Sequence, residues 1–105
     1  MKALTSRERR VGLELPLEVI GSDGRGESFV EMTRSLNVSG GGLLFKTERA
    51  LVVGSALRIV IHVPPTLRRH FQGKAVYKVR AVVCRVERFQ DDAVSKVGVR
   101  FLAES

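Results

Sequence analysis

A short polar stretch in the middle of the chain has residue types suited to holding a ligand. Asn37 and Ser39 carry short side chains that donate and accept hydrogen bonds, and three consecutive glycines, Gly40–Gly42, follow. Glycine permits positive backbone φ angles and lets a ligand approach the main chain closely. Taken alone, the stretch is most typical of a polar turn between two strands. Whether it is also a binding site depends on the rest of the chain.

Patterns that would support catalysis are weak in this sequence. His62, His70 and Cys84 lie beyond any usual zinc-binding spacing. Ser39 is not in the context of a nucleophile elbow, and the glycines lack the Lys and Ser or Thr of a P-loop. They also precede an expected strand, so no helix N-terminus is available there to hold a phosphate. We therefore expect a protein that is not an enzyme and that holds neither a metal nor a cofactor.

The charge balance favours anionic partners. The chain has 18 Lys and Arg against 11 Asp and Glu, a net charge of +7. Nucleic acid, nucleotides and acidic surfaces all fit that balance. Proteins that bind single-stranded nucleic acid usually interleave aromatic and basic residues, whereas this chain has five Phe, one Tyr and no Trp. We therefore expect no nucleic-acid partner.

Part of this charge lies in a basic N-terminal cluster that contains Arg7, Arg9 and Arg10. A terminal cluster of this kind is often a solvated tail. Its guanidinium groups are also planar forks that match phosphate and stack on flat rings. We predict a flexible basic arm over residues 1–12, followed by one domain over residues 13–105. If the arm lies across the glycine turn, the two segments together form a nucleotide site.

The length and cysteine content suit a small domain in a reducing compartment. A chain of 105 residues with a single cysteine, Cys84, can build a core but cannot form an internal disulfide. Residues 1–10 have no apolar segment of a secretory signal, and no apolar run reaches the ~20 residues of a membrane helix. We expect a cytoplasmic protein that does not insert into a membrane.

Short alternating segments separated by Gly, Pro and Asp predict an all-β barrel or sandwich. The expected strands cover residues 13–19, 29–38, 42–47, 57–63, 75–89 and 96–101. Pro16 predicts an edge strand or a bulge, and a slip in alternation predicts a bulge near Ala81. Cys84, among valines, is expected to be buried. Residues 66–72 have room for one helical turn.

Three segments in this order resemble the PilZ domain family, the bacterial receptor module for cyclic di-GMP. The family's second motif reads Asp or Asn, x, Ser, x, x, Gly, which matches Asn37-x-Ser39-x-x-Gly42 between the second and third expected strands. The segment 97–101, Val-Gly-Val-Arg-Phe, resembles the family's last strand. The segment 15–17, Leu-Pro-Leu, resembles its first. The similarity runs from about residue 7 to residue 102.

The resemblance implies a six-stranded antiparallel β-barrel with little helix and a role in second-messenger signal transduction. It implies that Asn37 and Ser39 recognise a guanine, that Gly42 permits the turn, and that arginines of an Arg-x-x-x-Arg motif grip phosphates and stack on guanine. The expected partners are cyclic di-GMP, often bound as an intercalated dimer, and an unknown protein effector. We expect the protein to be a monomer or a weak homodimer.

The arginine motif departs from the family pattern at one position. Counting back from the first strand, the second arginine falls on Arg10, whereas the first falls on Ser6. Arg7 lies three residues before Arg10 rather than four, and Arg9 is the third candidate. Two hypotheses therefore remain: a cyclic di-GMP receptor whose arm changes conformation on binding, or a PilZ-like protein-interaction module that has lost the ligand.

Overall fold

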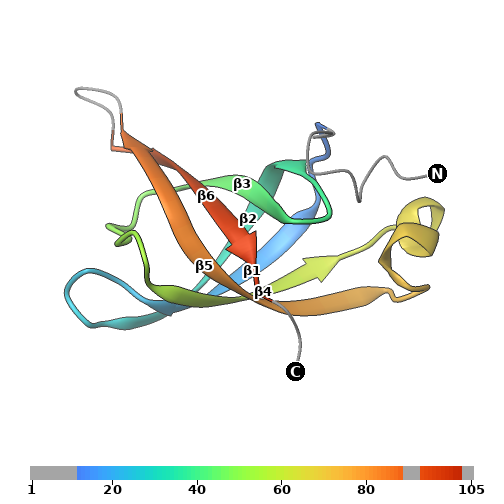
Figure 1. The fold of residues 1–105 in the computed structure, drawn as a ribbon, viewed down its shortest axis with the longest axis horizontal. Helices are drawn as coiled ribbons and strands as arrows, with labels where there is room; N and C mark the ends of the chain where they lie inside the picture. The colour runs from blue at the N-terminus through green and yellow to red at the C-terminus, as the bar shows by residue number, and fades with distance from the viewer. Residues whose placement is uncertain (1–11, 89–92, 103–105) are drawn as a thin grey trace.

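The structure, a computed structural model, describes residues 12–88 and 93–102. These residues contain six strands and one short 3₁₀-helix, joined by loops. Their bounds are β1 (Pro16–Ser22), β2 (Ser28–Val38), β3 (Gly42–Thr47), β4 (Ala56–His62), η1 (Pro65–Phe71), β5 (Val76–Arg88) and β6 (Ser95–Phe101). The strands close into an antiparallel barrel in the order β1-β2-β3-β6-β5-β4 (Figure 1). The predicted all-β fold with six antiparallel strands is therefore confirmed.

The alternating side chains fill the barrel as the two-residue period of a strand requires. On β4, Leu57, Ile59 and Ile61 are at most 2% exposed, whereas Arg58 is exposed on the outer face. The side chain of Phe45 from β3 is completely buried among them. The inward and outward residues of β4 both match the alternation in the sequence, so the core positions of this strand were predictable.

Two register shifts interrupt this alternation. Between β2 and β3 the pairing jumps from Ser35 to Asn37, and between β5 and β6 it jumps from Val83 to Arg85. The skipped residues are Leu36 and Cys84. The bulge expected near Ala81 therefore lies three positions later, at Cys84. The burial predicted for this cysteine is wrong: the shift leaves it exposed, with its thiol donating to the Gly98 carbonyl at 3.3 Å.

Pro16 lies neither on an edge strand nor at a bulge, contrary to the prediction. It is the first residue of β1 and pairs with Arg34 of β2, while the pairing of β1 with β4 begins only at Leu17. Proline has no backbone N–H, but the first residue of a strand need not donate a hydrogen bond to a neighbouring strand. The chain can therefore close a barrel around this residue.

The expected helical turn forms η1, which follows β4. Pro65 is compatible with its first turn because proline has its φ angle fixed near helical values. Its last residue, Phe71, is buried and packs edge-on against Tyr77 of β5, with ring centroids 5.6 Å apart. No helix among the described residues is long and apolar enough to span a membrane.

Candidate ligand-binding site

The stretch Asn37–Gly42 spans the connection between β2 and β3: Asn37 lies near the end of β2, Gly42 begins β3, and residues 39–41 join the two strands as a turn. Ser39 closes this turn: its N–H donates to the Gly42 carbonyl at 2.8 Å. The Ser39 hydroxyl donates to the same carbonyl and accepts from the Gly41 N–H, both at 3.3 Å. The side chain is only 8% exposed. Ser39 therefore holds the turn through one short main-chain hydrogen bond and two longer hydrogen bonds of its hydroxyl.

Gly42 is required by a close approach and not by its backbone angle. A β-carbon built at this position would lie 2.1 Å from the carbonyl oxygen of Val99 on β6. Neither Gly41 nor Gly42 has φ in the left-handed region, and a β-carbon on Gly41 would meet no atom within 4 Å. Its missing side chain lets β3 pack directly on β6.

The register shift at Leu36 determines where Asn37 points. Ser35, two residues earlier, is completely buried and pairs with the buried Phe45. Without the shift Asn37 would share that inward orientation, because residues i and i+2 of a strand face the same way. Instead Asn37 pairs with the half-buried Leu44 and is itself half-buried. Its amide therefore belongs to the outer surface, beside the Ser39 turn.

The segment that leads into β1 is fixed close to this turn. The Ser35 hydroxyl accepts from the Leu15 N–H at 2.9 Å and donates to the Leu13 carbonyl. Arg34 adds a hydrogen bond from its guanidinium Nη2 to the Glu14 carbonyl at 3.0 Å. The anchor at Ser35 lies two residues before Asn37. Residues 13–15 therefore run beside the part of β2 that leads into the turn.

The predicted arginines of the arm cannot be placed in the same way. Arg7, Arg9 and Arg10 lie outside the described residues, as does most of the predicted 1–12 arm. The structure therefore brings together Asn37, Ser39 and Gly42 from the list of predicted site residues. The roles assigned to the three arginines remain predictions.

One cation beside the turn was not among the predicted site residues. Arg100 of β6 pairs directly with Gly42, and its side chain is exposed. Paired residues of antiparallel strands face the same way, so the Arg100 guanidinium extends from the outer surface next to the Ser39 turn. The alternation of the last strand indicated an outward side chain but gave no information about this neighbour.

Other candidate chemistry is absent from the part of the chain that the structure describes. No group of three His, Cys, Asp or Glu side chains there could hold a metal ion. His62 instead contacts Glu18, with Nε2 3.0 Å from the carboxylate oxygen. The groove of about 770 Å³ on β1, β4 and β5 does not include the turn. The candidate site therefore consists of the Asn37–Gly42 turn and the neighbouring Arg100.

The model of the PilZ domain family matches residues 5–105. The chain therefore belongs to the PilZ domain family, and the family resemblance seen in the sequence is confirmed. A search of curated proteins found no match.

Solved structures show the same fold. The inhibitor of motility MotI/DgrA from Bacillus subtilis superposes with a TM-score of 0.63 at 19% identity, over 91% of this chain and 41% of that one. MrkH from K. pneumonia in complex with c-di-GMP superposes with a TM-score of 0.64 at 17% identity, over 94% of this chain and 45% of that one. Apo MrkH superposes with a TM-score of 0.61 at 15% identity, over 95% of this chain and 44% of that one. The chain thus spans less than half the length of these structures.

Proposed function

We propose that this protein is a receptor domain for cyclic di-GMP that binds the dinucleotide through the Asn37–Gly42 turn and the basic N-terminal arm. Binding changes the conformation of the arm, and the change is relayed to a protein partner. The domain acts by binding and relaying a signal, without catalysis. Support comes from membership of the PilZ family and from MrkH, a structural neighbour whose complex with c-di-GMP has been solved.

The observation that carries the proposal is the turn itself. The Asn37 amide faces outward because of the Leu36 register shift, and the Ser39 hydroxyl is held at the turn by two hydrogen bonds of 3.3 Å. Both groups have the donor and acceptor capacity to read the edge of a guanine. Gly42 lets β3 pack directly on β6, which fixes the position of the turn beside Arg100. The turn therefore presents both polar groups from a fixed backbone.

Cations adjacent to the turn would neutralise the phosphates. Arg100 lies opposite Gly42, and the segment that begins after the arm is anchored at Ser35. Arg10 is two residues before the first described residue, Gly12. An extended chain advances ~3.3 Å per residue, so an arm that continues from this anchor can reach the surface around Asn37. Arg10 is expected to contribute most, followed by Arg7 and Arg9.

Isothermal titration calorimetry with cyclic di-GMP tests the proposal. We expect saturable binding, which Arg10→Ala weakens by about 10- to 100-fold, the effect of losing one charged hydrogen bond. Ser39→Ala should weaken binding less, by roughly 2- to 10-fold, because its hydrogen bonds are neutral. Ser55→Ala is the matched control. Its hydroxyl also holds a turn, through the Val52 carbonyl, but lies outside the site.

Absence of any binding heat at tens of micromolar folded protein would refute the receptor function. It would favour the second candidate, a PilZ-like interaction module that has lost the ligand. The observation behind this alternative is Ser6, which stands where the family motif has its first arginine. Ser6→Arg should then restore binding if the missing guanidinium is the only defect.

A further inference from the structure

The outer face of β1, β4 and β5 carries a groove of about 770 Å³. Strand register determines its composition. Ile20 lies beside Arg58, which in turn lies beside Arg80, and in the next row Val60 lies between Glu18 and Lys78. The groove therefore combines an aliphatic floor with three cationic side chains on adjacent strands.

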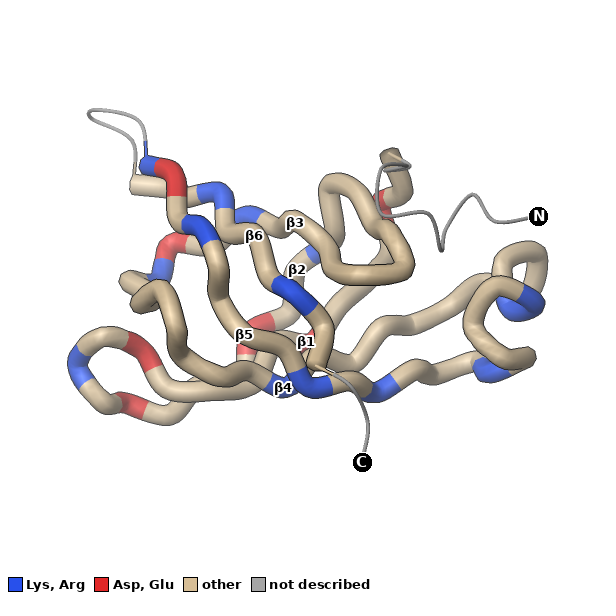
Figure 2. Tube along the Cα trace, viewed as in Figure 1, with Lys and Arg blue, Asp and Glu red and all other residues tan. Residues whose placement is uncertain are grey.

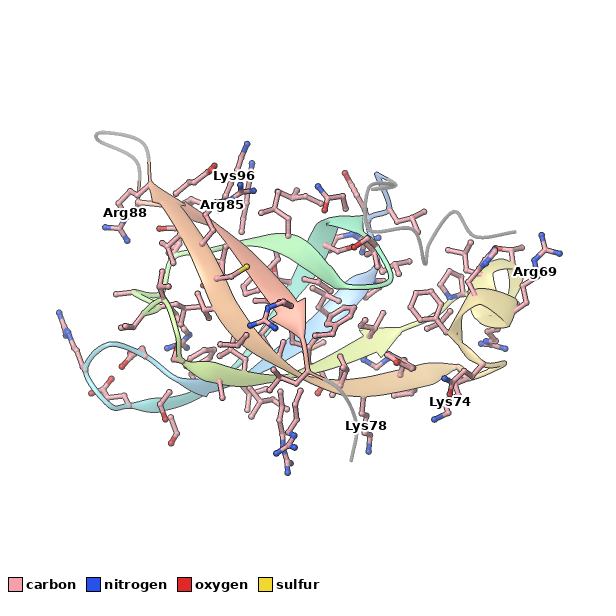
Figure 3. All side chains as sticks on the ribbon, viewed as in Figure 1. Arg69, Lys74, Lys78, Arg85, Arg88 and Lys96 are labelled. Atoms are coloured by element: carbon pink, nitrogen blue, oxygen red, sulfur yellow. The ribbon has the colours of Figure 1, made fainter. Side chains whose placement is uncertain are left out.

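These cations are not neutralised by the protein itself. Within residues 12–88 and 93–102, Arg58, Lys78 and Arg80 make no ion pair, whereas Glu18 of the groove is engaged by His62 at 3.0 Å. Figure 2 shows the basic positions following one another along β4 and β5 at the lower edge of the view. Lys78 projects away from the barrel there (Figure 3). The groove thus attracts an anionic partner.

An apolar strip continues the groove across β2. Val30 and Met32 are 62% and 65% exposed, although they sit in a regular strand. They pair with Ile20 and Glu18 of β1, so they lie directly beside the groove. Exposed apolar groups that adjoin one another usually mark an interaction surface rather than ordinary solvent-facing residues. We refer to the groove together with this strip as the β2-β1-β4-β5 face.

The backbone at the centre of this face is already fully paired. Residues 17–20 of β1 pair with both β2 and β4, and residues 58–61 of β4 pair with both β1 and β5. A partner therefore cannot add a strand to the sheet here and has to contact side chains. The residues that line the groove include no Phe, Tyr or Trp on which a nucleic-acid base could stack.

We propose that the β2-β1-β4-β5 face is a docking surface for an acidic amphipathic helix of a partner protein. The apolar side of such a helix would cover Val30, Met32 and Val60. Its acidic residues would pair with Arg58, Lys78 and Arg80. Charge complementarity and the exposed aliphatic strip both select this partner over a uniformly charged polyanion. The surface does not depend on cyclic di-GMP binding, because none of its residues belongs to the Asn37–Gly42 turn.

A synthetic helix of about 18 residues is long enough to be helical in water and serves as the probe. One version carries leucines on one side and glutamates on the other, and a matched version replaces each glutamate by lysine. We expect the acidic version alone to bind the full chain, as measured by fluorescence anisotropy. Amide shifts in ¹⁵N NMR should lie on β1, β2, β4 and β5. Affinity should fall as salt is raised.

Two double variants separate a local docking surface from general charge attraction. The double variant Arg58→Glu with Arg80→Glu should lower the affinity for the acidic helix by about tenfold or more. Arg25→Glu with Arg69→Glu changes the net charge equally at exposed positions outside the groove and should leave affinity within about twofold. Met32→Gln tests the apolar half and should also weaken binding. All substitutions are at exposed positions, and circular dichroism would verify folding.

Several results would overturn the proposal. They are failure of the acidic helix to bind, equal binding of the lysine version, equal losses in the two double variants, or amide shifts confined to other strands. Tighter binding of a single-stranded oligonucleotide at the same residues would assign the face to nucleic acid instead. Cyclic di-GMP shifts centred on the groove would assign it to the dinucleotide.

Discussion

Replacing Gly42 with alanine tests the close contact between β3 and β6 at the candidate site. The new methyl group would lie 2.1 Å from the Val99 carbonyl oxygen and 3.1 Å from its carbon, whereas real β-carbons essentially never approach within 3.0 Å of such atoms. The strands would have to separate by about 0.9 Å at this point. The obstacle is backbone, so no side-chain rotation can relieve it.

We expect this overpacking to lower the free energy of unfolding by about 1–3 kcal/mol. With a urea dependence of about 1–3 kcal/mol per molar, the unfolding midpoint falls by roughly 1 M. Cyclic di-GMP binding should weaken as well, because the separation displaces Arg100 and loosens the carbonyl that Ser39 contacts. Urea unfolding followed by circular dichroism, together with calorimetry, measures both effects.

Gly41→Ala is the matched control for this experiment. A β-carbon there meets no atom within 4 Å, and Gly41 does not have φ in the left-handed region. Its substitution should be neutral or stabilise the fold by up to about 1 kcal/mol, because the unfolded chain loses freedom. Equal urea midpoints for the two variants would refute the assignment of Gly42 to a backbone contact.

Two further substitutions test the surroundings of the site, and a third tests the loop between β1 and β2 at the other end of β2. Ser35→Ala removes the acceptor of the buried Leu15 N–H and should cost about 1–3 kcal/mol of unfolding free energy; a urea midpoint equal to that of the wild type would contradict the anchor. Arg100→Ala should weaken cyclic di-GMP binding by about 10- to 100-fold in calorimetry. Arg69→Ala, on η1, serves as its control, and equal affinities of the two variants would remove Arg100 from the site. Hydrogen bonds from the backbone N–H groups of Glu27 and Arg25 lower the pKa of Asp23 below its ordinary 3.8. A carboxyl group whose pKa is lower in the folded state than in the unfolded state stabilises the fold when the pH is above the unfolded-state pKa. This stabilisation by Asp23 is lost as the pH falls through the folded-state pKa, and Asp23→Asn should remove the pH dependence. An NMR titration that finds the Asp23 pKa at or above 3.8 would contradict this.

Much of the barrel follows from local pattern. The alternation determined which side chains are buried on β4, and it placed Val97, Val99 and Arg100 correctly on β6, because a strand has a two-residue period and one of its faces must leave water. The glycine-rich turn, the helical turn after Pro64 and the outward direction of Arg58 were predictable for the same local reasons. So was the family motif that joins Asn37, Ser39 and Gly42.

Only the tertiary structure decided which residues face one another across strands. Asn37 turns outward and Cys84 is exposed because register shifts break the alternation, and such shifts depend on how two distant strands pair. Likewise, Arg100 becomes a neighbour of Gly42 only through the pairing of β6 with β3. The basic groove needs β1, β4 and β5 to lie side by side. Register is a property of strand pairs, so a single sequence read along its length does not contain it explicitly.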